Sequence, residues 1–445
     1  MSDDEIKNDR RWAERKVGFA RFWARAKQVL TTDPTGSDED DLVVDEEAAR
    51  ALAAQAGRLK GGLAKVAQLA AYDPGASLGR GRGASVAARQ VLGGLWDKAP
   101  TISAGAIASV IEKDLGKAPQ ALFAEWDPLP IASASLGQVH GAKLHDGTNV
   151  VVKVQYPGVA EALRADLDDD AFIRKLAGAE IGKSLDDEAL HALAEAVRSE
   201  LDYVAEADIQ SKFATAWDGD RTVRVPRVIR ELSTTRVLTM TRARGKTVVD
   251  TASASPDIRA QAAAAIYKFA WGSPLAHGLL NADPNPGNFL VETESDGHVV
   301  VHCLDFGCAL TLPDSVRDAD RQIWWGLLDE DASSAAERFR MALQDSGLLR
   351  RADSIATIAH REWEGALARP LLTHGSFHWD AKYAGDFAET TGRVLASGGL
   401  QLPARLLLLW RQRLGVAAVI GMLDAHAPFR RVLFDLIGSG KRALR

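Results

Sequence analysis

Three short motifs, which follow one another along the chain, constrain the fold of this sequence more than any other feature. Lys153 interrupts an apolar, β-branched strand sequence, VVKV. Asp283 opens the loop segment DPNPGN, in which Asn288 follows five residues later, and Asp305 opens DFG directly after the apolar run VVVHCL. A lysine in an apolar strand favours anionic partners, and carboxylates beside an amide oxygen suit a metal ion. Each motif alone is weak, because Asp-Pro and Asp-x-Gly are also ordinary turn sequences.

Together the three motifs match the kinase pattern of a strand lysine, a catalytic-loop Asp-x-x-x-x-Asn and a DFG aspartate. Phosphoryl transfer depends mainly on positioning and charge neutralisation, so two metal ligands and one base form its minimum set. We therefore expect Asp283 to orient the attacking hydroxyl, and Asn288 and Asp305 to ligate Mg²⁺. Lys153 is expected to contact phosphates. Gly307 is expected to supply the freedom for a sharp turn after Asp305.

The length and composition predict a folded protein with a catalytic body and helical extensions. The chain has 445 residues, of which 46% are hydrophobic and 26% charged, and a single core rarely grows to that length. Mixed strands come first and helices later, so we expect an α+β, bilobal, protein-kinase-like fold. The expected segments are a flexible N-terminal segment (1–43), a helical N-terminal extension (44–125), a kinase-like N-lobe (126–245) and a large helical kinase-like C-lobe (246–445).

The charge and hydropathy of the chain limit which binding partners and which cellular location are expected. A formal net charge of −6 and a pI near 6.0 argue against a nucleic-acid partner, which requires clustered basic residues. The charged start of the chain predicts no signal peptide. The apolar stretch from Leu406 to Leu423 contains Arg411 and Arg413, so it predicts a buried helix and no transmembrane helix. We expect a cytoplasmic protein, and peripheral contact with a membrane stays open.

Four further segments are long enough to narrow the class. They are KVAQ (65–68), PIASASLGQVHGA (130–142), SELDYVAEAD (199–208) and GLLNADPNPGNFLV (278–291). In order, they resemble the Lys-x-Gly-Gln motif, the alanine-rich loop, the Glu-x-Asp motif and the catalytic loop of the UbiB/AarF atypical kinases. The resemblance covers roughly residues 60–307 directly, and it favours this family over ordinary protein kinases, since no APE-like segment follows DFGCALTLPD.

The resemblance implies ATP and Mg²⁺ as cofactors, held between the lobes. It assigns to the nucleotide Ala132, Ser133, Ala134, Ser135, Lys153, Glu206 and Met240, with Glu206 as the ion-pair partner of Lys153. A regulatory group, consisting of Lys65, Gln68, Glu200 and Asp202, is expected near the helix that covers the active site and excludes protein substrates. Asp202 and Glu206 are expected to share a helix face.

The implied function is an ATP-dependent phosphotransferase or ATPase in isoprenoid-quinone (ubiquinone) or related lipid metabolism. Its partners would be ATP or ADP, a small-molecule or lipid-like substrate, lipid-biosynthesis enzymes and a membrane surface. An ATP-gated, non-catalytic lipid-binding or chaperone-like protein stays open as the alternative. Two departures favour that alternative: Ala67 replaces a glycine, and Asn281 replaces a histidine that is common in the family. Asn285 also replaces a common histidine.

Overall fold

The structure, a computed structural model, divides into two compact units. It describes residues 103–134, 136–158, 160, 198, 201–328, 332–349, 358–396 and 404–437. The first unit comprises residues 1–184 and 236–239, and the second comprises 185–235 and 240–445. The predicted flexible segment, most of the predicted helical extension, and Lys65, Gln68, Ser135 and Glu200 lie outside the described residues. The segment boundaries at residues 43, 125 and 245 stay predictions.

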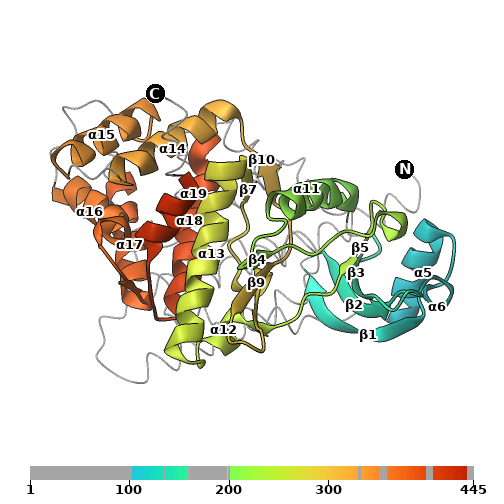
Figure 1. The fold of residues 1–445 in the computed structure, drawn as a ribbon. Coiled ribbons are helices and arrows are strands. Elements are labelled where there is room, and N and C mark those ends of the chain that lie inside the picture. Colours follow the sequence, from blue (N-terminus) through green and yellow to red (C-terminus); the bar gives the residue numbers. More distant parts are fainter. Residues whose placement is uncertain are drawn as a thin grey trace, which may run out of the picture. The chain divides into compact units, whose positions relative to one another are not determined.

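The described part of the first unit is a small sheet with short helices beside it (Figure 1). The sheet has the strand order β1-β2-β3-β5, and β1, β2 and β3 pair antiparallel. The elements are α5 (Ala104–Leu115), α6 (Pro119–Leu122), β1 (Glu125–Ala134), β2 (Gly137–Lys143), β3 (Asn149–Gln155) and β5 (Val237–Thr241), the last of which continues into the second unit. Three valines of β3, Val150, Val152 and Val154, are fully buried.

Helix α5 is fixed to this sheet by both apolar and charged contacts. Ser103 caps its N-terminus by accepting from the Ala106 amide, and Gly116 ends it in the left-handed conformation with φ 75°. Arg236, just before β5, forms a bidentate ion pair with Asp114 in the last turn of α5. The Asp114 side chain is only 9% exposed, so this pair is screened less by solvent than a surface pair would be.

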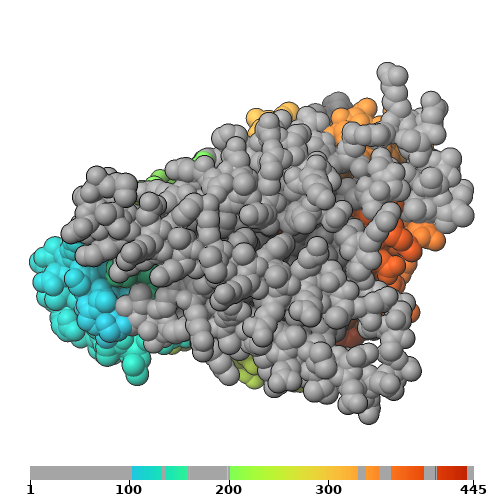
Figure 2. Space-filling view, turned by 180° about the vertical axis from the view of Figure 1, so that it is seen from behind, coloured from blue at the N-terminus to red at the C-terminus, as the bar shows by residue number. Residues whose placement is uncertain are grey.

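The edge strand β1 keeps apolar side chains in solvent. Leu129 and Ile131 are 72% and 44% exposed. Figure 2 shows part of the surface of the first unit in cyan to teal. Pro128 and Pro130 lie in the same strand. Because proline has no amide hydrogen to donate, these residues protect the edge from pairing with another strand.

The second unit combines a four-stranded sheet, two small sheets and a large set of helices (Figure 1). The four-stranded sheet has the order β4-β9-β8-β6, while β7 pairs with β10 and β11 with β12. Its strands are β4 (Val223–Arg224), β6 (Lys246–Thr247), β7 (Leu279–Asn281), β8 (Phe289–Thr293), β9 (Val299–Cys303), β10 (Ala309–Thr311), β11 (Phe377–Trp379) and β12 (Ala425–Ala427). Its helices are α11 (Tyr203–Ala216), η2 (Arg230–Leu232), α12 (Val248–Thr251), α13 (Pro256–His277), η3 (Pro286–Asn288), α14 (Asp314–Leu328), α15 (Ala332–Asp345), α16 (Ile358–Leu372), α17 (Ala381–Ala396), α18 (Ala404–Met422) and α19 (Phe429–Ile437).

Helix α13 is the central element of the second unit. Ser255 caps its N-terminus, and Gly278, with φ 66°, ends it directly before β7. The helix packs against α18, α19 and strand β9, and its alanines let these neighbours approach closely. The start of the loop that follows β7 therefore adjoins a long helix with many buried residues.

Helix α18 confirms the expectation of a buried helix at 406–423. Arg413, 0% exposed, donates through both terminal nitrogens to the carboxylate of Asp320 on α14, with Nη1 2.6 Å from Oδ1. The guanidinium also lies over the rings of Trp271, Trp324 and Trp410, the nearest being Trp324 at 4.6 Å. Within the described part of the chain, no helix combines the length and the apolar character needed to span a bilayer.

Candidate active site

Two antiparallel strand pairs of the second unit, β7 with β10 and the hairpin of β8 and β9, bring the predicted catalytic loop next to the DFG segment. Strand β7 leads into the loop and pairs with β10, with Asn281 opposite Ala309. Strand β8 leaves the loop and pairs antiparallel with β9. The Leu304 amide donates to the carbonyl oxygen of Asn288 at 2.8 Å. Backbone contacts thus join the two segments at two places. The strand before the Asp283 loop pairs with the strand after Asp305, and the end of the loop is bonded to the residue before Asp305.

The side chain of Asn281 connects the two predicted catalytic carboxylates through their main chains. Its Nδ2 donates to the carbonyl oxygen of Asp305 at 2.9 Å, and its Oδ1 accepts from the amide of Asp283 at 3.2 Å. Asn281 is 6% exposed, so these bonds lie in a low-dielectric environment where they strongly favour one geometry. The asparagine therefore supplies one donor and one acceptor without a titratable group.

Asp305 itself adopts the left-handed conformation. Its φ is 54°, and Asp305 and Asp424 are the non-glycine residues with positive φ within the described ranges. Gly307 lies in a turn but does not have a positive φ, so its role in permitting a sharp turn stays a prediction. Aspartate tolerates this region better than most residues, and here Oδ1 of Asp305 accepts from the Gly307 amide at 3.2 Å.

The amide of Asn288 is oriented by Asp283. Its Nδ2 donates to Oδ2 of Asp283 at 3.2 Å and to the carbonyl oxygen of the same residue at 3.3 Å. Since the nitrogen side of the amide is used there, the oxygen side is the one that would ligate a cation. Asn288 and Asp305 present the oxygen donors that Mg²⁺ prefers, and Mg²⁺ needs only one or two protein carboxylates beside phosphates and water. The donor set thus fits Mg²⁺. A site made of three or more His, Cys, Asp or Glu side chains, which would hold a metal without phosphates, does not occur among the described residues.

Helix α11 places a buried carboxylate beside the DFG segment. Glu206 is 2% exposed, and its Oε1 accepts from the Phe306 amide at 3.4 Å. The ring of Phe306 packs on Phe213, about two turns further along α11, with centroids 4.8 Å apart. Asp202 is the N-cap of α11 and accepts from the amides of Val204 and Ala205. The Glu206 amide donates to the Asp202 carbonyl oxygen at 3.0 Å, one helical turn earlier, and the expectation that the two side chains share a helix face stays a prediction.

A buried amide that sequence reasoning missed fixes α11 to the segment that carries Met240. Gln210 is fully buried, and its Nε2 donates to the Pro226 carbonyl oxygen at 2.8 Å and to the Met240 sulfur at 3.4 Å. Gln210 lies one helical turn after Glu206, so a single face of α11 contacts both the DFG segment and Met240. A glutamine within an Ala/Glu-rich helix has no sequence signal that distinguishes it from a solvated one.

Lys153 lies on β3 of the first unit, within the strand, and is 9% exposed. Its predicted ion pair with Glu206 stays a prediction. Ala132 and Ala134 lie at the end of β1, where they pair with Val139 and Gly137 of β2. The alanine-rich segment is therefore strand at least to Ala134, and the cupping of phosphates by its amides stays a prediction.

The first residue of β2, Gly137, lies close to the backbone of β3. A Cβ at Gly137 would lie 2.1 Å from the Val154 carbonyl oxygen, so only glycine fits there. Beyond it, His140 is fully buried and stacks on Trp126, with ring centroids 4.9 Å apart. Burial lowers the pKa of His140. The hydrogen bond between its Nδ1 and the Asp127 carbonyl oxygen acts to raise this pKa, but burial outweighs it.

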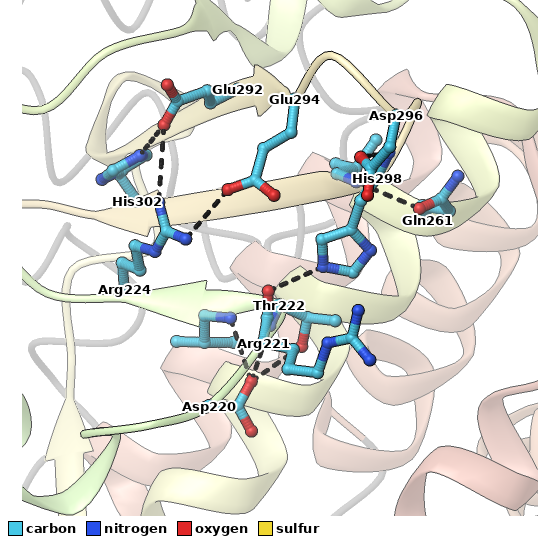
Figure 3. A network of polar contacts seen from close by, with 12 residues as sticks. Asp220, Arg221, Thr222, Arg224, Gln261, Glu292, Glu294, Asp296, His298 and His302 are labelled. Carbon is cyan, nitrogen blue, oxygen red and sulfur yellow. Dashed lines mark hydrogen bonds and ion pairs between the residues drawn. The ribbon is translucent and has the colours of Figure 1, made fainter.

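A polar network fixes the end of the β8–β9 hairpin that is distant from Asn288 and Asp305 (Figure 3). His302 Nε2 lies 2.7 Å from Glu292 across the two strands, and Arg224 on β4 donates to Glu294 at 2.9 Å. The turn is fixed in addition by Gln261 of α13, which accepts from the Val299 amide at 3.1 Å. Both ends of the hairpin are thus held, so the strands that carry the predicted metal ligands keep their register.

Beside this network, Lys268 of α13 forms an ion pair with Asp220, whose other oxygen caps the turn into β4. Burial opposes the ionisation of Asp220, but the hydrogen bonds from Lys268 and Thr222 outweigh it and lower the pKa of Asp220. The strand next to β9 is therefore fixed to α13 by a charged contact at neutral pH.

Comparison with known proteins agrees with this geometry. Residues 94–339 match the family described as "ABC1 atypical kinase-like domain". The chain is 30% identical over 334 residues to rat "Atypical kinase COQ8B, mitochondrial", and 29% identical over 306 residues to yeast "Atypical kinase COQ8, mitochondrial". These matches cover 73% and 67% of this chain, but only 61% and 58% of the relatives, so the chain spans about three fifths of their length.

A solved structure shows the same fold. It is described as "The complex structure of Rv3197-erythromycin from Mycobacterium tuberculosis", and it matches with a TM-score of 0.61 and 24% identity. The match covers 90% of this chain and 98% of the other. The fold is thus of the α+β, kinase-like class that the sequence predicts.

Proposed function

The chain belongs to the ABC1 atypical kinase-like family, the UbiB/AarF-like group that its motifs resemble, and we propose that it binds ATP with Mg²⁺ between its two lobes and transfers or hydrolyses the γ-phosphate. One observation carries the proposal. Asn281 joins the main chains of Asp283 and Asp305, and Asp283 in turn orients Asn288. A kinase site needs these three groups in one place.

Each of these residues has a role in the proposed reaction. Asn288 and Asp305 would hold Mg²⁺, which would neutralise charge on the phosphates. Asp283 would orient the attacking hydroxyl or water and accept its proton. Lys153 would contact the phosphates, with Glu206 keeping the ammonium in place, and Met240 would contact the base of the nucleotide. The backbone from Ala132 to Ser135 would surround the phosphates.

The substrate would be a small molecule or a lipid-like compound. The names of the rat and yeast relatives, both COQ8-type atypical kinases, support a role in isoprenoid-quinone or related lipid metabolism. The similar Mycobacterium tuberculosis structure is a complex with erythromycin, so a macrolide belongs in any ligand panel. Lys65, Gln68, Glu200 and Asp202 would regulate access, and lipid-biosynthesis enzymes and a membrane surface would be the further partners.

A non-catalytic, ATP-gated lipid-binding or chaperone-like protein is the second candidate. The asparagines at 281 and 285 favour it, since neither can accept a proton near neutral pH. In the structure, however, Asn281 bridges the main chains of Asp283 and Asp305, and Asn285 caps its own turn by accepting from the Gly287 amide at 2.8 Å. Both asparagines therefore serve the loop geometry, which supports the catalytic candidate.

The deciding experiment separates binding from turnover. Purified protein is titrated with ATP and ADP, each with and without Mg²⁺, while the melting temperature is followed. ADP formation, which accompanies both transfer and hydrolysis, is then measured with quinone-precursor, lipid and macrolide additives. The proposal predicts Mg²⁺-dependent stabilisation and Mg²⁺-dependent ADP formation that Asp283→Asn abolishes. Stabilisation without ADP formation under all additives would select the second candidate. No stabilisation by any nucleotide would contradict both.

A further inference from the structure

Helix α18 lies directly against the predicted catalytic loop at a glycine. A Cβ added to Gly415 would lie 2.2 Å from Cγ and 2.4 Å from Cβ of Pro284. Real Cβ atoms essentially never approach other heavy atoms so closely, so even alanine at this position requires a movement. Gly415 is buried inside α18 and does not end the helix. At such a position glycine lowers the stability of a helix relative to alanine. A contact that only glycine permits explains its presence.

Helix α18 is too firmly held to make room. Two residues before Gly415, Arg413 is bound to Asp320 of α14, and Gln412 Nε2 donates to the Ala270 carbonyl oxygen of α13 at 3.0 Å. Two residues after Gly415, the Ala417 carbonyl oxygen accepts from Trp379 Nε1 at 3.0 Å. The helix is therefore fixed on both sides of the contact by neighbours from three other elements.

The loop is the side that would move. Pro284 is buried and its ring is part of the backbone, so displacement of the ring displaces the main chain of Asp283, to which it is bonded. That displacement acts on the Asp283 amide, which donates to Asn281, and on the Asp283 carboxylate, which orients Asn288. Overpacking at Gly415 would thus be transmitted into the loop.

We propose that Gly415 is a positioning residue for the reaction, and that α18 is the support against which the loop carrying Asp283 is set. The predicted effect of Gly415 on turnover rests on the proposed function, whereas its predicted effect on the loop rests on geometry alone. This role makes the helical region beyond residue 404 part of the catalytic apparatus, through a contact with the loop and not through a group that takes part in the chemistry.

Gly415→Ala tests the support, and two glycines provide matched controls. Gly385 on α17 has no atom within 4 Å of an added Cβ, so Gly385→Ala measures the effect of the substitution in an open helix position. Gly421, also on α18, would meet the Ala384 Cβ and the Asp380 carbonyl oxygen, both at 3.0 Å. Gly421→Ala therefore disturbs the packing of the same helix away from Pro284.

Two readouts are taken for each variant. The first is hydrogen exchange of the peptide that spans residues 279–289, which needs no activity; the second is kcat and KM for Mg²⁺-dependent turnover. We expect Gly415→Ala to speed exchange in that peptide and to lower kcat about a hundredfold, since a displacement of about 1 Å has that effect, with KM changed less than about threefold. Gly385→Ala and Gly421→Ala are expected to match the wild type in both readouts.

Wild-type hydrogen exchange and a wild-type kcat in Gly415→Ala would overturn the proposal. A loss of kcat in Gly421→Ala as large as that in Gly415→Ala would overturn it too. A wild type without turnover contradicts the proposed function, and the exchange of peptide 279–289 then decides the support alone.

A second variant covers a failure to fold. Pro284→Gly removes both atoms that an added Cβ would meet, so the double variant with Gly415→Ala should fold and lose no more kcat than Pro284→Gly alone. A double variant that fails to fold, or whose losses multiply, contradicts the contact with Pro284.

Discussion

Asn281 donates a hydrogen bond to the main-chain carbonyl oxygen of Asp305 at 2.9 Å, from a side chain whose oxygen accepts from the Asp283 amide. This bond holds Asp305 at φ 54°, in a region that costs free energy for a residue with a Cβ. One asparagine thus couples the position of the proposed base to the position of a proposed metal ligand.

Removal of this bridge should lower turnover more than stability. Asn281→Ala leaves the Asp305 carbonyl and the Asp283 amide without this partner, and we expect kcat to fall by about tenfold or more as both carboxylates lose their fixed positions. Asn281→His restores a ring donor and should recover most of the rate. Steady-state kinetics on both variants tests this, and equal rates in Asn281→Ala and the wild type would show that the bridge has no catalytic effect.

If Lys153 pairs with Glu206, as proposed, the two residues should have coupled effects on nucleotide affinity. Lys153→Met and Glu206→Gln should each weaken Mg²⁺–ATP binding, and Glu206→Gln keeps an oxygen for the Phe306 amide, so the loss reports the charge. Because each variant already removes the pair, the double variant should bind no more weakly than Lys153→Met alone. Calorimetric titration measures all four proteins; strictly additive losses would refute the pairing.

The buried His140 predicts a loss of stability in acid. Burial holds the pKa of His140 below its ordinary 6.5, so the unfolded chain takes up the proton first as the pH falls. The free energy of unfolding should therefore be unaffected well above pH 6.5 and decrease below it, by up to about 1.4 kcal/mol per pH unit, until the folded pKa is passed. Urea unfolding at a series of pH values should show a shallower slope for His140→Gln, and an unchanged slope would contradict this contribution of His140.

The buried pair of Arg413 and Asp320 predicts an asymmetry between single and double substitutions. Arg413→Met leaves the Asp320 carboxylate buried without its cation and should cost about 3–5 kcal/mol of unfolding free energy. Combined with Asp320→Asn, which retains an oxygen for the Trp324 indole at 3.0 Å, the loss should be smaller. Denaturant unfolding compares the two proteins, and a double variant less stable than Arg413→Met would contradict this explanation.

The parts of the site that the sequence predicted are those encoded within one loop or one strand. Asp283, Asn288 and Asp305 lie in short motifs whose spacing is itself the chemical requirement, and the structure brings them together with Asn281. The lysine-bearing strand and the buried helix at 404–422 follow from β-branched density and apolar character. Local patterns were sufficient for these elements because the determining interactions are local.

The features that the sequence did not predict depend on contacts between distant segments. Gly415 resembles any tolerated helical glycine until Pro284 is seen against it. Gln210 resembles a solvated residue of an acidic helix, although it is fully buried against Pro226 and Met240. Asp202 was placed within the helix because periodicity does not locate helix ends to a single residue. The left-handed conformation of Asp305 was not predicted either, since that region is uncommon for residues other than glycine.

The most direct test of the account is the Mg²⁺ dependence of ATP binding in Asp305→Asn, measured by calorimetry beside the wild type and Asp345→Asn, a substitution at an exposed aspartate at the end of α15. We predict that Mg²⁺ tightens ATP binding to the wild type and to Asp345→Asn, and that Asp305→Asn loses this gain. A gain of the same size in Asp305→Asn would show that Asp305 holds no metal, and the proposed site would be wrong.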